Sequence, residues 1–250
     1  MKILVLPDVQ AKHGNDFGFL TSIGNYIVSK KPDVIVNLGD FCDFESLSAW
    51  DIGKKSFEGR SYQRDIQATR DAMDALLTPL YEFNANAKKT KHKPYKPRMV
   101  LTLGNHEDRL TRTINGDRKL DGLISLDDLP YQDWEVYPFL EVVVIEGVAF
   151  SHYFTSGAMG RPCGTAQQLL NKKHMSCVAG HAQGRQIAYA KRADGKDMTA
   201  LIIGSCYEHE EGYLGIQGNQ HWRGLYLLHN VVDGSFDECA VPLQYIKDNY

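Results

Sequence analysis

Residues 99–107, MVLTLGNHE, decide the fold of this chain. A short apolar run is followed at once by glycine and by side chains that can bind metals, a pattern typical of a buried parallel strand and the turn after it. The chain shows this pattern twice earlier, where residues 3–6 precede Asp8 and residues 34–38 precede Gly39 and Asp40. Because helical patterns separate the three runs, we expect βαβ units in the first half of the chain.

Two helices are expected between these strands. The first covers residues 17–30, where Leu20, Ile23 and Ile27 share one face and Pro32 lies beyond the end. In the second, Pro79 should end or kink the helix. That helix passes through apolar residues at helical spacing, namely Ile66, Met73, Leu76, Leu77 and Leu80.

The second half of the chain has the character of antiparallel hairpins. Glu-Gly at residues 146–147 and Asp-Gly at residues 194–195 and 233–234 each lie between apolar segments. A parallel half followed by an antiparallel half predicts an α/β fold, with two packed β-sheets flanked by helices in an αββα sandwich. No linker interrupts the 250 residues, so we expect a single domain over residues 1–250, with a basic loop around residues 84–98.

The composition excludes several classes of protein. With 43% hydrophobic and 24% charged residues, the chain is not disordered, collagen-like or coiled-coil. The first apolar run is too short for a secretion signal, and no stretch is long enough to span a bilayer. The five scattered cysteines indicate neither a disulfide framework nor a thiolate zinc site, which favours the reducing cytoplasm. A net charge of -3 predicts no general affinity for nucleic acid or membranes, although the lysines of residues 84–98 offer a nucleic-acid patch as the alternative to a solvated loop.

Side chains that bind metals recur after five of the expected strands. Each group alone would be no more than a turn. The carboxyl ends of strands in an open α/β sheet are where ligand sites assemble, so five such groups predict one shared site. Carboxylate, amide and imidazole are ligands that divalent metals accept. The five groups are Asp8 with Gln10, Asp40, Asn105 to Glu107, His152, and His181 with Gln183.

The order of these motifs resembles the calcineurin-like metallophosphoesterase family, whose pattern is Asp-x-His, Gly-Asp-x-x-Asp, Gly-Asn-His-Asp/Glu, a separate His and Gly-His-x-His. The resemblance covers residues 8–183 and implies a β-sandwich flanked by helices. It also implies two divalent metal ions that activate a water, as hydroxide, against phosphorus. Asp8 and Asp40 would hold the first metal, and Asp40 would bridge to a second held by Asn105, His152 and His181. The opening PDVQ, residues 7–10, is similar to phosphoesterases encoded by bacteriophages.

This sequence departs from the family pattern at Gln10 and Gln183, where the family has histidine, and both departures fall on the first metal. In one interpretation the two amide oxygens replace imidazoles as ligands, which favours Mn²⁺, Mg²⁺ or Ca²⁺ over Zn²⁺. In the other, the first site is weak or empty and the enzyme uses one tightly held metal. We expect two divalent ions with Mn²⁺ preferred, since Asp8 and Asp40 still supply two carboxylates.

Residues next to these motifs are candidates for proton transfer and for substrate binding. The resemblance implies that His106 is the acid that protonates the leaving oxygen. Glu107 would accept a hydrogen bond from the His106 ring and favour the imidazolium, or would be an acid at a helix N-terminus. Arg109 and Arg161 are candidates for binding phosphate oxygens, and Tyr153 for stacking on a nucleobase.

The function that these residues predict is a metal-dependent phosphoesterase acting on phosphodiesters of nucleotides or nucleic acid. The family's protein phosphatases carry arginine where this chain has Phe44 and Leu103, so a protein serine/threonine phosphatase is the alternative enzyme. The alternative that is not an enzyme is a metal-binding scaffold that has lost catalytic activity because glutamines replace the two histidines. Residues 208–211, EHEE, have no recognised metal-ligand spacing and are expected to form a solvated turn.

Overall fold

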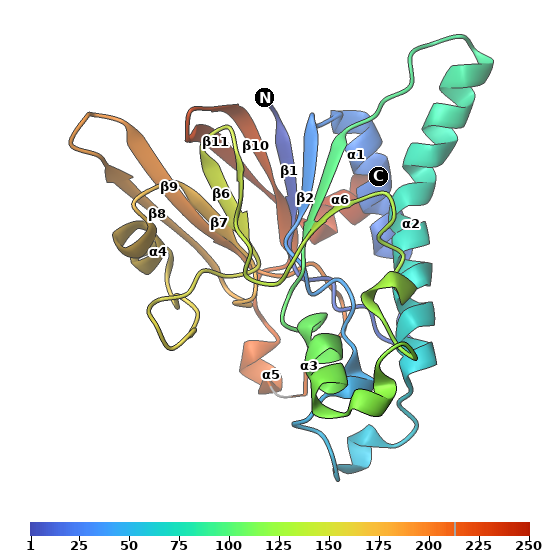
Figure 1. Cartoon of the computed structure of the whole chain (residues 1–250). Coiled ribbons are helices and arrows are strands. Elements are labelled where there is room, and N and C mark those ends of the chain that lie inside the picture. Colours follow the sequence, from blue (N-terminus) through green and yellow to red (C-terminus); the bar gives the residue numbers. More distant parts are fainter. Residues whose placement is uncertain (213) are drawn as a thin grey trace.

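The strands form two mixed sheets that pack face to face, with helices against both outer faces (Figure 1). The computed structural model describes residues 1–212 and 214–250. The architecture is the expected αββα sandwich. Within the described residues, no helix combines the length and the apolar character that crossing a bilayer requires.

The first sheet contains the three strands that the sequence predicted, a fourth strand that it did not predict, and a hairpin from the end of the chain. Its strand order is β11 (Ser235–Pro242), β10 (Gly224–Val232), β1 (Ile3–Leu6), β2 (Val34–Asn37), β3 (Arg98–Thr102) and β4 (Glu135–Tyr137). Strands β1 to β4 pair in parallel, whereas β10 runs antiparallel to β1. The C-terminal hairpin thus covers the free edge of β1, where unpaired backbone groups would otherwise be exposed.

The second sheet mixes both pairing directions. Its strand order is β5 (Val143–Ile145), β6 (Val148–Ser151), β7 (Cys177–Ala179), β9 (Asp197–Ile203) and β8 (Arg185–Lys191). Strands β6, β7 and β9 pair in parallel. The three expected hairpins are confirmed, but the expected division into a parallel half and an antiparallel half is wrong, because the last hairpin joins the first sheet and the second sheet has a parallel centre.

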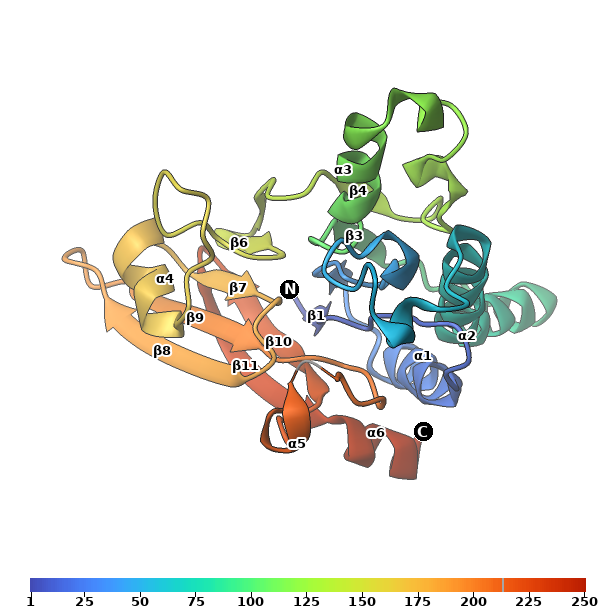
Figure 2. The same cartoon turned by 90° about the horizontal axis from the view of Figure 1, so that it is seen from below.

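Three layers of apolar side chains hold the sandwich together. Along β1, Ile3 and Val5 point into the core between the sheets, whereas Leu4 and Leu6 point toward the helices, as the alternation of a strand requires. Figure 2, seen from below, shows α1 (Gly18–Lys30) and α2 (Tyr62–Lys89) outside the first sheet and α4 (Ala166–Lys173) outside the second. The remaining helices are α3 (Asp108–Gly116), α5 (Gly215–Gly218) and α6 (Leu243–Asn249).

Helix α2 continues through Pro79, so the prediction that the helix ends there, one of the two alternatives, is wrong. It ends at Lys89, so residues 84–89 of the expected basic loop are helical and only the part that follows is a loop. A proline inside a helix costs about 3 kcal/mol, but burial of each large apolar side chain stabilises the helix by about 1.5–3 kcal/mol. Because α2 buries Leu76, Leu77 and Leu80 around the proline, packing outweighs that cost. Gly24 of α1 permits the close approach, since a Cβ there would lie 2.8 Å from Pro79.

Candidate active site

The predicted metal-binding groups follow strands of both sheets. Asp8, Asp40 and Asn105 come after β1, β2 and β3 of the first sheet, and His152 and His181 come after β6 and β7 of the second. Contacts join the two sheets at this edge. The backbone N–H of His181 donates to Asp8 Oδ1 over 3.1 Å, and His152 Nε2 lies 2.9 Å from Asn105 Oδ1. The tertiary structure therefore brings all five groups together.

The backbone at this edge is unusual in conformation. Gln10, Asp40 and His181 have positive φ angles of 47°, 48° and 65°, a region that costs non-glycine residues free energy and that is concentrated at functional sites. The turns after β2 and β3 also touch, because a Cβ on Gly104 would lie 2.0 Å from Asp40 Oδ1. Only glycine at that position lets the carboxylate occupy its place.

Atoms that carry lone pairs face one another around His152. Its Nδ1 donates to the carbonyl of Leu38 over 2.7 Å, and burial lowers the pKa of its imidazole to about 4, so Nε2 carries a lone pair at neutral pH. That nitrogen lies 2.9 Å from Asn105 Oδ1 and 3.4 Å from Asp40 Oδ2. Because both oxygens of a carboxylate are acceptors, rotation of the Asp40 side chain cannot place a donor opposite His152 Nε2. A cation between these atoms would convert their repulsion into coordination.

A second imidazole completes this group. One ligand atom each of Asp40, His152 and His181 lie within 4.8 Å of one another. Burial and the neighbouring His152 lower the pKa of His181 to about 4, so this ring is neutral as well. One carboxylate and two neutral imidazoles form a donor set that suits a divalent metal, and the residues therefore fit the ion that the family pattern implies for the second position.

The predicted first metal position also contains acceptors without donors. Asp8 and Gln10 are almost fully buried, and neither Asp8 Oδ2 nor Gln10 Oε1 receives a hydrogen bond from any described residue. Burial and the charge of Asp40 raise the pKa of Asp8 well above its usual range. Gln183 differs, because its Oε1 accepts a hydrogen bond from the Tyr207 hydroxyl over 2.9 Å. Two buried oxygens without partners suit a cation, whereas the Gln183 oxygen already has one donor.

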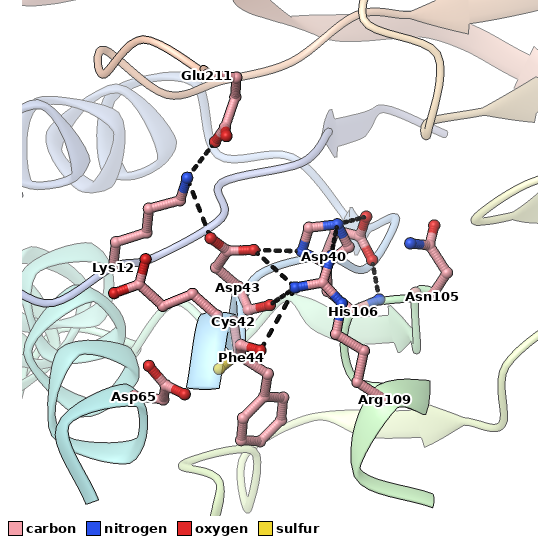
Figure 3. A network of polar contacts seen from close by, with 12 residues as sticks. Lys12, Asp40, Cys42, Asp43, Phe44, Asp65, Asn105, His106, Arg109 and Glu211 are labelled. Carbon is pink, nitrogen blue, oxygen red and sulfur yellow. Dashed lines mark hydrogen bonds and ion pairs between the residues drawn. The ribbon is translucent and has the colours of Figure 1, made fainter. Parts of the chain in front are cut away.

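His106 lies beside these groups and pairs with Asp43, a residue to which the sequence analysis gave no role (Figure 3). His106 Nδ1 lies 2.5 Å from Asp43 Oδ1, and its Nε2 lies 3.7 Å from Asp40 Oδ2. The two carboxylates raise the pKa of His106 to about 9, against the opposing effects of burial and of Arg109. The second aspartate of the Gly-Asp-x-x-Asp motif was the sequence signal that could have identified this partner.

The expected hydrogen bond from the His106 ring to Glu107 is wrong. The fully buried Glu107 carboxylate instead accepts five hydrogen bonds of 2.9–3.0 Å, four of them from backbone N–H groups. The donors are the backbone N–H groups of Asp40, Phe41, Cys42 and Gly104 and the hydroxyl of Tyr131. Glu107 therefore positions the turns that carry Asp40 and His106, because its two oxygens bind both turns at once.

A buried ion-pair network extends from Asp43 away from the metal group. Lys12 Nζ lies 3.1 Å from Asp43 Oδ2 and also pairs with Glu211, as Figure 3 shows. Glu211 in turn contacts His209 Nε2 at 2.8 Å. The expectation that residues 208–211 form a solvated turn is thus wrong for Glu211, which is 6% exposed. The cation that holds it, Lys12, is 199 residues away in the sequence and gave no local signal.

The predicted substrate residues lie in three different environments. The Arg109 guanidinium donates to the Asp43 carbonyl over 2.8 Å and lies 3.0 Å from His106 Nε2, so it belongs to the network beneath the site. The Arg161 side chain is exposed and makes no hydrogen bond or ion pair with a described residue. The Tyr153 ring packs beside His181, with ring centres 4.8 Å apart.

The basic segment is remote from these residues. Residues 90–97 lead into the amino end of β3, whereas Asn105 and His106 follow its carboxyl end. Figure 1 shows the segment beyond the far end of α2, at the opposite edge of the sheet. Its lysines are exposed, as expected for a solvated loop.

The chain was compared with protein families, with curated proteins and with solved structures. Residues 1–189 match the calcineurin-like phosphoesterase family. Among solved structures, the chain is similar to Yfce, a phosphoesterase from E. coli, with 13% identity and a TM-score of 0.41, over 96% of this chain and 100% of that one. It is also similar to a conserved uncharacterized protein, a predicted phosphoesterase, from Streptococcus pneumoniae TIGR4, with 11% identity and a TM-score of 0.33, over 96% and 97% of the two chains. No curated protein matches the sequence. Since the family match includes every strand-end motif, this chain belongs to the calcineurin-like phosphoesterase family and is a metal-dependent hydrolase of phosphoester bonds.

Proposed function

We propose that this chain hydrolyses phosphodiesters of nucleotides or nucleic acid and that it uses two divalent cations, preferentially Mn²⁺. The observation that carries the proposal is the set of buried acceptor atoms at the edge of both sheets that face one another or lack a donor. Asp40 Oδ2 and His152 Nε2 are 3.4 Å apart, and the buried atoms Asp8 Oδ2 and Gln10 Oε1 have no donor among the described residues. Such acceptors are stabilised by cations.

The ligand chemistry supports one oxygen-rich position and one richer in nitrogen. Asp8, Gln10 and Asp40 would hold the first ion, with Gln183 as a further amide oxygen. Asp40, Asn105, His152 and His181 would hold the second. Carboxylate and amide oxygens favour Mn²⁺ or Mg²⁺ over Zn²⁺. When bound, the two ions supply an activated water and positive charge for the phosphoryl oxygens.

The chain's own residues would supply the proton for the leaving oxygen. His106 Nδ1 faces Asp43, which orients the ring and favours its protonated form. Nε2 would then pass a proton to the departing oxygen as the bond to phosphorus breaks. The Arg109 guanidinium, 3.0 Å from Nε2, can only donate and would have to turn away from the protonated nitrogen. Lys12 and Arg109 hold Asp43 from two sides and so keep it in place for this pairing.

The preference for diesters and for nucleotides rests on residues around the site. Phe44 and Leu103 stand where the family's protein phosphatases have arginine, and Tyr153 packs beside His181, where a nucleobase could stack. A cytoplasmic location and the bacteriophage origin suggested by residues 7–10 stay predictions from the sequence.

The test combines metal content with activity. The protein is stripped with a chelator and reloaded separately with Mn²⁺, Mg²⁺, Zn²⁺ or Ca²⁺, and bound metal is counted by mass spectrometry. Bis-nitrophenyl phosphate is then compared with nitrophenyl phosphate. We expect two ions per chain and faster turnover of the diester with Mn²⁺. Preference for the monoester would favour a phosphatase, and bound metal without turnover would favour the silent scaffold.

A further inference from the structure

A cavity of about 740 Å³ opens beside His106. His106, Asp43 and Arg109 line it, whereas none of the proposed metal ligands is among its described lining residues. The cavity therefore lies next to the proposed proton donor and apart from the metal group. In a reaction where His106 protonates the leaving oxygen, this is the space that the leaving group would occupy. Its volume lies within the range of about 300–1,000 Å³ that is usual for small-molecule pockets.

The charges of the cavity wall exclude a highly charged occupant. Apart from His106, the described lining contains four cationic side chains and five carboxylates, a surplus of one negative charge. Most of them pair with one another. Lys12 is held by Asp43 and Glu211, and Arg60 Nη1 lies 2.8 Å from Asp51 Oδ2. A second phosphate would find no cation without a partner acid on this wall, so the chemistry favours a neutral group.

Two of the paired carboxylates retain an oxygen for such a group. Glu45 uses Oε2 toward Arg60 at 3.5 Å, and Glu211 uses Oε1 toward Lys12 and His209. The other oxygen of each receives no hydrogen bond from a described residue. Carboxylate oxygens accept hydrogen bonds from sugar hydroxyls, as they do for ribose in dinucleotide sites.

An aromatic ring lies at the mouth of the cavity. Trp50 lines the cavity and is 85% exposed, so its indole face is free to receive a second ring. The other two tryptophans differ, since Trp134 is 7% exposed in the core and Trp222 packs against Tyr226. An exposed indole beside free acceptors suits a ligand with a planar base and a hydroxylated sugar.

We propose that this cavity binds a neutral nucleoside as the leaving group, with its base on Trp50 and its hydroxyls on Glu45 and Glu211. This inference rests on the proposed function and narrows its substrate class to small nucleotide esters. Water attacks phosphorus and forms a new P–O bond, the bond from phosphorus to the nucleoside oxygen breaks, and that oxygen takes the proton from His106. The products are a free nucleoside and a phosphate or phosphate monoester.

The first test measures binding without turnover. Adenosine, which carries no phosphate, is titrated into the metal-loaded protein by calorimetry. We expect saturable binding that Trp50→Ala weakens about 5- to 150-fold, the usual effect of losing one stacked base. Leu123→Ala, which removes a side chain that is also exposed but lies outside the cavity lining, is the matched control and should bind like the wild type. Absence of adenosine binding, or equal effects of the two variants, would overturn the proposal.

The second test measures leaving-group preference. The methyl ester of adenosine 5′-phosphate is compared with the methyl ester of ribose 5-phosphate, which lacks the base. Trp50→Ala should lower kcat/KM for the adenosine ester far more than for the ribose ester, and Trp50→Phe should restore part of the preference. Equal losses on both esters would refute the stacking role. If no phosphoester is turned over at all, the proposed function fails, while the adenosine titration still decides whether the cavity binds a nucleoside.

Discussion

Replacing Glu107 with glutamine tests whether this carboxylate holds the two active-site turns together. In the wild type, Oε2 accepts from Asp40 and Gly104, and Oε1 accepts from Phe41, Cys42 and the Tyr131 hydroxyl. A glutamine has one acceptor oxygen, and its NH₂ group would face at least two backbone N–H groups. The shape of the side chain is conserved, so the substitution changes hydrogen bonding with little change in volume.

The expected cost follows from the number of unsatisfied donors. Each buried donor that loses its acceptor costs about 1–3 kcal/mol, which gives about 2–6 kcal/mol for Glu107→Gln. The whole stability of a domain is about 5–15 kcal/mol. We expect this loss in urea unfolding followed by tryptophan fluorescence, together with weaker metal binding, because the Asp40 backbone loses its anchor.

Two controls make this measurement specific. Tyr131→Phe removes one of the five hydrogen bonds and should cost about 1 kcal/mol. Glu141→Gln changes an exposed carboxylate and should leave stability within about 0.5 kcal/mol of the wild type. If Glu107→Gln unfolded at the same urea concentration as Glu141→Gln, the positioning role of Glu107 would be refuted.

Three further substitutions address the chemistry of the site. His106→Asn should slow esters with poor leaving groups about 10²- to 10⁴-fold and activated nitrophenyl esters far less; equal losses in kcat would remove the acid role. Asp43→Asn takes away a carboxylate that raises the pKa of His106, so that pKa falls. Activity that needs protonated His106 should then decline at lower pH, and an unmoved alkaline limb of the pH–rate profile would contradict the pairing. Gln10→His should raise bound Zn²⁺ relative to Mn²⁺ after dialysis against equal concentrations of both, as counted by mass spectrometry; an unchanged metal ratio would show that residue 10 does not reach the ion.

Much of the fold could be predicted because its signals are local. The turns at residues 146–147 and 233–234 need positive φ at both positions, and the structure has 48° and 79° at Glu146 and Gly147 and 47° and 83° at Asp233 and Gly234. Buried parallel strands can likewise be recognised in a sequence as short apolar runs before glycine and polar residues. Such patterns depend on neighbours along the chain, so a single sequence contains them.

The predictions that were wrong concern features that depend on contacts between segments far apart in the sequence. Pro79 predicts a helix end or a kink, and the helix does not end there because packing of α2 against α1 outweighs that preference. The sequence of the last hairpin does not indicate that β10 pairs with β1. Which strands pair depends on which edge of a sheet is free after the other strands have paired. Local propensity is overridden wherever burial of apolar surface supplies more free energy.

The sequence by itself determined which residue types follow which strands, and so predicted that Asp8, Asp40, Asn105, His152 and His181 meet at one edge. Only the tertiary structure decided the partners of those residues. Asp43 and Glu107 are both acids close in sequence to metal-binding motifs, yet one pairs with His106 and the other binds the backbone of two turns. The direction in which a side chain leaves a turn depends on the backbone dihedral angles of that turn. It also depends on contacts between segments that are far apart in the sequence, such as those of Lys12 and Glu211. Both the angles and the contacts are set only when the chain has folded.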